Sequence, residues 1–111
     1  MRINILLYCP DAAQLQHLEQ LISREEGWEH TGTTSDEQAI ELFNRERFDL
    51  IIMAGDIAPA IDAKLKKLFT MLDRHINILN FYGGDDWFLR VQVSTILKLD
   101  EPEGPVIDNP F

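Results

Sequence analysis

FDLIIMAGDI (residues 48–57) is the stretch of the sequence that says most about the fold. Its apolar run from Leu50 to Ala54 is continuous rather than alternating, which is typical of a parallel strand buried on both faces. Gly55 ends this run and Asp56 follows it. Because ligands of open α/β sheets bind beyond the carboxyl ends of the strands, we expect any functional site to lie near Gly55 and Asp56.

Strand and helix patterns alternate on both sides of this stretch. Short apolar runs predict further strands at residues 3–8, 28–34 and 76–82. The second of these runs is Thr-rich and suits the edge of a sheet. Apolar residues at helical spacing predict helices between the strands, with Asp11 and Ser35 as N-caps, Gln38 completing a capping box, and Pro59 opening the third helix. Four strand-then-helix units in succession predict an α/β fold, in which right-handed crossovers through the helices join parallel strands. The sheet is therefore expected to be mostly parallel.

Two details of these helices are also predicted. The first helix is expected to stop at Gly27. The inner face of the third helix is predicted to hold Leu65, Leu68, Phe69 and Leu72. Lys64, Lys66 and Lys67 lie mostly outside this apolar stripe, as on a solvated face.

Residues 86–99 admit two interpretations. A helix after the cap Asp85 would be apolar around its whole circumference, as in a buried or interface helix. The alternation from Val91 to Leu99 predicts instead a strand rich in β-branched residues. We favour the helix. Residues 1–99 then form one domain and residues 100–111 an acidic tail, in which Val106–Asp108 is a candidate for a short last strand.

The composition limits the classes of partner. The 111 residues suffice for one domain, and ten Lys and Arg against nineteen Asp and Glu give a formal net charge of −9. This charge repels nucleic acids and anionic membranes, so we expect neither as a partner. No apolar run approaches the ~20 residues of a membrane span, no signal-peptide pattern is present, and the single cysteine excludes an internal disulfide. We expect a cytoplasmic protein.

In this order, the elements resemble the receiver domain of two-component response regulators. The resemblance covers nearly the whole chain apart from a last helix. It rests on the spacing of the elements and on residues 28–42, 48–52 and 109–111. It implies a flavodoxin-like, three-layer αβα fold with a mostly parallel sheet of four or five strands in the order 2-1-3-4-5.

The resemblance also implies a phosphorylation pocket, but several of its residues differ here. The pair of acids that holds Mg²⁺ after the first strand matches Cys9 and Pro10, with Asp11 just beyond. The phosphoacceptor aspartate, five residues after the Asp that opens the third strand, matches Ala54. Alanine cannot accept a phosphoryl group.

Two further positions depart from the receiver pattern. The Ser or Thr at the end of the fourth strand is replaced by Phe81 or Tyr82, and the Lys before the closing Pro-Phe is replaced by Asn109. The degenerate pocket comprises Cys9, Pro10, Asp11, Ala54, Asp56, Tyr82 and Asn109. Because phosphoryl transfer depends on positioning and on charge neutralisation, these departures indicate a pseudo-receiver that is not an enzyme and needs no metal or cofactor.

Other interpretations of these residues remain open. A two-residue slip would bring Asp56 beside Asp11 and restore two carboxylates for Mg²⁺, giving a divergent but active phosphoacceptor. Cys9 at a helix start could be a nucleophile, although a small buried hydrophobe is favoured. Gly83-Gly84 is favoured as a turn over an anion site. A fainter alternative is a nucleotide- or flavin-binding protein, for which the sequence lacks a phosphate loop.

The predicted interface lies on the fourth helix. Trp87 and Phe88 are adjacent, so they cannot both face the core, and large aromatics are favoured interface anchors. The resemblance implies that receivers associate through the region of their fourth and fifth helices, and the absence of a fifth helix is expected to leave apolar surface uncovered. We therefore expect a protein partner, in the simplest case a homodimer, contacting Trp87, Phe88 and Val91. A two-fold interface and exchange of the segment after Gly84 both remain open.

Overall fold

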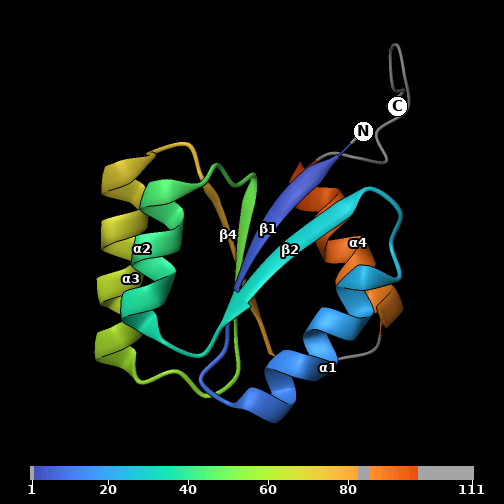
Figure 1. Cartoon of the computed structure of the whole chain (residues 1–111), viewed down its shortest axis with the longest axis horizontal. Coiled ribbons are helices and arrows are strands. Elements are labelled where there is room, and N and C mark those ends of the chain that lie inside the picture. The colour runs from blue at the N-terminus through green and yellow to red at the C-terminus, as the bar shows by residue number, and fades with distance from the viewer. Residues whose placement is uncertain (1, 83–85, 98–111) are drawn as a thin grey trace, which may run out of the picture.

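The chain folds into three layers, with a parallel sheet between two pairs of helices, as the computed structural model in Figure 1 shows. The structure describes residues 2–82 and 86–97. The strands are β1 (Ile3–Tyr8), β2 (Trp28–Thr33), β3 (Leu50–Ala54) and β4 (Asn77–Phe81). The helices are α1 (Ala12–Ser23), α2 (Asp36–Arg45), α3 (Pro59–Leu72) and α4 (Asp86–Leu97). The predictions for Asn109 and for a last strand at Val106–Asp108 concern residues outside the described ranges.

The sheet has the predicted topology. Its strand order is β2-β1-β3-β4, and every pair is parallel. All five residues of β3 are buried, which confirms that a continuous apolar run marks a strand covered on both faces. The predicted edge strand, β2, lies at one edge, and β4 lies at the other end of the order.

The predicted N-caps are confirmed, one of them with a difference. The Asp11 carboxylate accepts hydrogen bonds from the backbone N–H groups of Ala13 and Gln14, at 2.9 and 3.3 Å. The Ser35 hydroxyl accepts from the backbone N–H of Gln38 at 3.1 Å. The Gln38 side chain does not return to Ser35, because the Thr33 hydroxyl donates to its Oε1 and itself accepts from the Ser35 N–H at 3.0 Å.

Two details predicted for the helices are wrong. α1 ends at Ser23 rather than at Gly27, because i→i−3 bonds such as Glu25 N–H to the Ile22 carbonyl turn the chain before the glycine. Leu72 is 49% exposed, although it was predicted on the inner face of α3. Among the described residues of that helix, Leu65 and Phe69 are the ones fully buried.

The core is divided by the sheet. One apolar cluster joins alternate residues of the strands, such as Ile5 and Ile52, to α1 and α4. The other joins the intervening residues, such as Leu6 and Ile51, to α2 and α3. This alternation is the two-residue period of a strand with both faces covered.

The structure resolves the two interpretations for residues 86–97. α4 is a helix, so the strand interpretation is wrong, and Leu89 and Val93 pack with β4 residues on the face of the sheet that α1 also covers. α4 thus covers part of this face of the sheet. Phe88 and Val91 remain 43% and 38% exposed.

The position of α4 limits how the sheet can continue. The crossover from β3 to β4 passes through α3 on the opposite face. A right-handed crossover from β4 to a strand beyond it would need its helix on that same face. Since α4 lies with α1 instead, it is not the helix of such a crossover, and β4 ends the described sheet.

Candidate functional site

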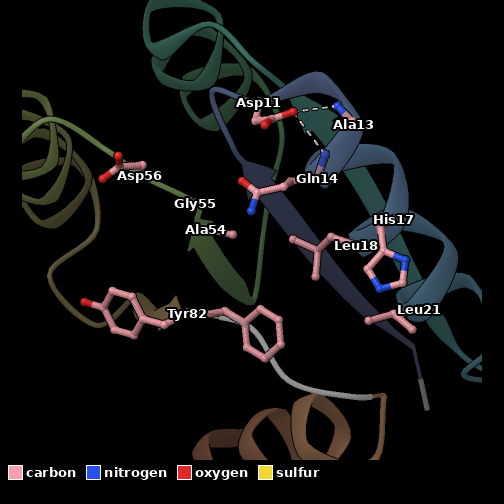
Figure 2. Close-up of a pocket in the computed structure, with 11 residues that line it drawn as sticks. Asp11, Ala13, Gln14, His17, Leu18, Leu21, Ala54, Gly55, Asp56 and Tyr82 are labelled. Atoms are coloured by element: carbon pink, nitrogen blue, oxygen red, sulfur yellow. Dashed lines mark hydrogen bonds between the residues drawn. The ribbon is translucent and has the colours of Figure 1, made fainter.

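A pocket of about 720 Å³ lies beyond the carboxyl ends of β3 and β4 and beside α1 (Figure 2). Asp11, Ala54, Asp56 and Tyr82 from the predicted set all line it, together with Gly55. They come from the loops after β1 and β3 and from the end of β4, as expected for parallel strands whose carboxyl ends meet at one edge.

Polar and apolar side chains line different parts of this pocket. The apolar part is formed by Leu18 and Leu21 of α1 with Ala54 and Phe81 from the strand ends. Figure 2 shows Asp11 and Gln14 on one side of the pocket and Asp56 across from them. The polar residues Gln14 and His17 were not predicted, although a helix that begins after the cap Asp11 places both near the same strand end.

Ala54 occupies the end of the central strand. It is 7% exposed and is paired with Phe81 of β4. Its methyl group can neither accept a phosphoryl group nor ligate a metal ion. The position that the receiver resemblance assigns to the phosphoacceptor is thus chemically inert.

The loop after Ala54 is held in register by Gly55. Gly55 has φ 85°, a left-handed conformation that favours glycine. A Cβ atom at this position would lie 2.8 Å from Gln14 Oε1 and 3.0 Å from Cys9 Sγ. The left-handed backbone disfavours any other residue at this position, which opposes the slip that would carry Asp56 inward.

The two carboxylates of the pocket have different surroundings. Asp11 uses its Oδ1 to cap α1, whereas Asp56 is exposed. Within residues 2–82 and 86–97, no group of three His, Cys, Asp or Glu residues is placed to hold a metal ion. Two carboxylates in one pocket are nevertheless the chemistry that Mg²⁺ prefers.

Cys9 and Pro10 adjoin this pocket without lining it. The Cys9 thiol is fully buried, 3.5 Å from the Asp11 carbonyl and 3.7 Å from Gln14 Oε1. Burial raises the pKa of this thiol, and the hydrogen bond to the Asp11 backbone offsets the rise only in part. Cys9 is therefore a small buried group rather than an activated nucleophile, while Pro10 lies exposed in the bend between β1 and α1.

Two of the lysines assigned to a solvated face are in ion pairs. Lys64 on α3 contacts Asp36 on α2 at 2.5 Å, and Lys66 contacts Asp62 at 3.1 Å. The hydrogen bond between the first pair lowers the pKa of Asp36 and raises the pKa of Lys64. Burial, followed by the negative charge of Asp36, raises the pKa of the neighbouring Tyr8 phenol.

The described part of the proposed interface belongs to α4. Phe88 contacts Phe81 of β4, with ring centroids 6.4 Å apart. Trp87 lies in α4, but its side chain is outside the part that the structure describes. None of the described helices is long and apolar enough to cross a membrane.

Solved structures with the same fold include receiver domains. The signal receiver domain of an HD domain-containing protein from Pseudomonas fluorescens aligns with a TM-score of 0.66 and 21% identity, over 89% of this chain and 97% of that one. A response regulator receiver protein from Pseudomonas putida aligns with a TM-score of 0.63 and 19% identity, over 86% and 80% of the two chains. A pilus assembly-related protein from Burkholderia pseudomallei aligns with a TM-score of 0.59 and 19% identity, over 85% and 72%.

The sequence itself matches no protein-family model and no curated protein. The structural likeness shows the fold: residues 2–82 and 86–97 have a receiver-like fold of the flavodoxin-like type, with the first four strands of the predicted order. Likeness of fold does not assign a function, which has to be argued from the site.

Proposed function

We propose that the chain is a receiver-like signalling module that binds a protein partner without being phosphorylated. The observation that carries this proposal is Ala54 at the end of β3, inside the pocket and at the position of the phosphoacceptor. The structural neighbours include a signal receiver domain and a response regulator receiver protein, which supports a role in signalling. The module acts by binding, has no cofactor, and works in the cytoplasm.

The charges around the pocket support the same proposal. Phosphoryl transfer needs groups that neutralise the developing negative charge. The described lining includes Asp11 and Asp56 but no Lys or Arg. Lys64 and Lys66 are engaged with carboxylates on helices. A phosphoryl group entering this pocket would meet negative charge without a fixed cation.

The partner surface is the exposed side of α4. Phe88 and Val91 present apolar area there, and Trp87 precedes them in the same helix. A helix that buries one side in the core and exposes large apolar residues on the other is typical of an interface. The module self-associates through this surface.

The first experiment is intact-protein mass spectrometry after incubation with acetyl phosphate and Mg²⁺. We expect no phosphoryl adduct, because Ala54 offers no acceptor. A stoichiometric adduct on the unmodified chain that is lost in Asp56→Asn would overturn the proposal.

That adduct would support a second candidate, a divergent phosphoacceptor using Asp56 with Mg²⁺ held by Asp11. The observation favouring it is that both carboxylates line one pocket. Asp11→Asn then serves as a further variant: in the divergent receiver it should reduce the Mg²⁺ dependence of the adduct.

Self-association is tested separately by native mass spectrometry. We expect the chain to be a dimer and Val91→Asp to shift it to monomer while it stays folded. Met71→Asp is the matched control, since Met71 is a 71% exposed apolar residue on α3, the helix across the sheet. Loss of the dimer in both variants, or in neither, would count against the α4 surface.

A further inference from the structure

The outer edge of β4 is open in the described structure. β4 pairs with β3 on one side and with no described strand on the other. The position of α4 on the α1 face shows that this helix does not lead into the next strand of a right-handed series. Among the described residues, no strand pairs with the backbone N–H and C=O groups along this edge.

This edge lacks the features that usually keep edges apart. Natural sheets protect exposed edges with charged side chains, Pro or bulges. The sequence of β4, Asn-Ile-Leu-Asn-Phe, contains neither charge nor Pro, and β3 and β4 pair without interruption from Leu50 with Asn77 to Ala54 with Phe81. An uncharged, regular edge is suited to pairing with another strand.

The side chains beside this edge include an ion pair and exposed aromatic residues. On the α3 side, Lys66 pairs with Asp62 at 3.1 Å, and the Asn80 amide donates to Asp62 at 3.4 Å. At the carboxyl end, Tyr82 is 86% exposed and Phe88 is 43% exposed. A partner strand would meet a compensated acid on the α3 side and aromatic area at the carboxyl end.

We infer that a second copy of this chain adds its own β4 to this edge, antiparallel, so that two four-stranded sheets become one continuous sheet. This inference rests on the proposed self-association and gives it a geometry. Pairing centred on Asn80 sets Leu79 against Phe81 of the partner subunit, and Ile78 against Tyr82 of the partner subunit. Centring on Leu79 instead sets Ile78 against Asn80 of the partner subunit. The first register pairs apolar with apolar, as stable cross-strand pairs require.

The apolar residues of β4 favour an antiparallel second copy. In the register centred on Asn80, Ile78 and Leu79 each lie opposite an apolar or aromatic residue of the partner subunit. The strand is thus complementary to itself.

The test is disulfide crosslinking of Asn80→Cys in the full chain under mild oxidation. Residues directly opposite in an antiparallel pair have Cα atoms about 4.5–5.5 Å apart, within the range that a disulfide spans. The native Cys9 is fully buried and should not react. We expect a covalent dimer from Asn80→Cys, and monomer from the matched control Thr31→Cys on the edge strand β2.

A second variant keeps the test independent of crosslinking chemistry. Ile78→Lys places a charge on the edge and should weaken the dimer about tenfold or more by native mass spectrometry, whereas Thr31→Lys should not. Suppose that the wild type is a dimer, but that Asn80→Cys gives no specific crosslink and Ile78→Lys has no effect. This result would overturn the β4 geometry and leave the proposed function standing. A wild-type chain that is monomeric at all concentrations would overturn both.

Discussion

The two edges of the sheet, β2 and β4, occupy equivalent places in the topology but differ in chemistry. β2 carries Glu29, which pairs with Arg2 at 3.1 Å, and His30, which lies 3.6 Å from Glu19 of α1. No charged residue occurs between Asn77 and Phe81 of β4. One edge strand therefore carries a charged residue in an ion pair, while the other is uncharged.

This difference shows what determines whether an edge strand stays unpaired or pairs with another chain. Both strands pair with a single described neighbour, so topology alone does not distinguish them. Side chains do, because charges on an edge strand make pairing with another chain costly. The receiver-like fold has two edge strands, and charged side chains disfavour pairing at one of them, β2.

The largest expected effect concerns how much each edge contributes to the core. Phe81→Ala should reduce the free energy of unfolding by about 3–5 kcal/mol, because Phe81 is 6% exposed and contacts Phe88. Trp28→Ala on β2 should cost less, since Trp28 packs against the core from a half-buried position. Urea unfolding of both variants, at a concentration where both are monomeric, makes the comparison. Equal losses would mean that β4 is no better anchored than β2.

A smaller effect is expected on removing the protection of β2. Glu29→Val with His30→Val, in the Thr31→Cys background, turns β2 into an uncharged edge. Cross-strand pairs contribute about 0.2–1 kcal/mol each, so we expect roughly a fivefold rise in crosslinked dimer over Thr31→Cys alone. Non-reducing gel electrophoresis measures the crosslinked fraction. If crosslinking does not rise, the charges on β2 are not what keeps that edge unpaired.

The sequence predicted those parts of the fold that depend on local patterns. The strand at residues 3–8 has the predicted bounds, and the caps Asp11 and Ser35 act as predicted, because apolar runs and capping side chains are read within a few residues. The face covered by α4 was not predicted. Apolar residues all around that helix hid its inward side, and which face it covers is decided by the path of the chain after β4.

The pocket was predicted where its residues end or follow the strands, as Asp11, Ala54, Asp56 and Tyr82 do. Counting from Asp49 put Ala54 at the site, and the structure has Ala54 in the pocket lining. Gln14 and His17 were missed because they lie within α1 rather than at the end of a strand. The Lys64–Asp36 contact joins residues 28 apart in the sequence, so no local pattern could reveal it.

The smallest expected effect lies where the helices over the two edges meet. Lys64 of α3 pairs with Asp36 of α2. α3 contacts β4 through Asp62, and α2 packs beside β1 and β2, so this ion pair connects the two helices. The pKa of Asp36 is lowered in the folded state, so its contribution is present above the unfolded pKa, about 3.9, and is lost as pH falls through the folded value. The pKa of Lys64 is raised, so its contribution is present below about 10.4 and is lost as pH rises through the folded value.

Lys64→Gln should therefore be slightly less stable than the wild type at neutral pH, and the difference should vanish in acid once Asp36 is protonated. The side chains of Lys64 and Asp36 are 46% and 25% exposed, so solvent screens the pair, and the effect is small and should shrink further at high salt. Thermal unfolding across the acidic range measures it, with Lys67→Gln as control, since Lys67 is exposed on the same helix and has no ion pair among the described residues. A constant difference between Lys64→Gln and wild type at every pH would mean that Lys64 acts through packing of its side chain. α2 and α3 would then be held together by apolar contact. The ion pair between them would not stabilise the contact between the β2 and β4 sides of the domain.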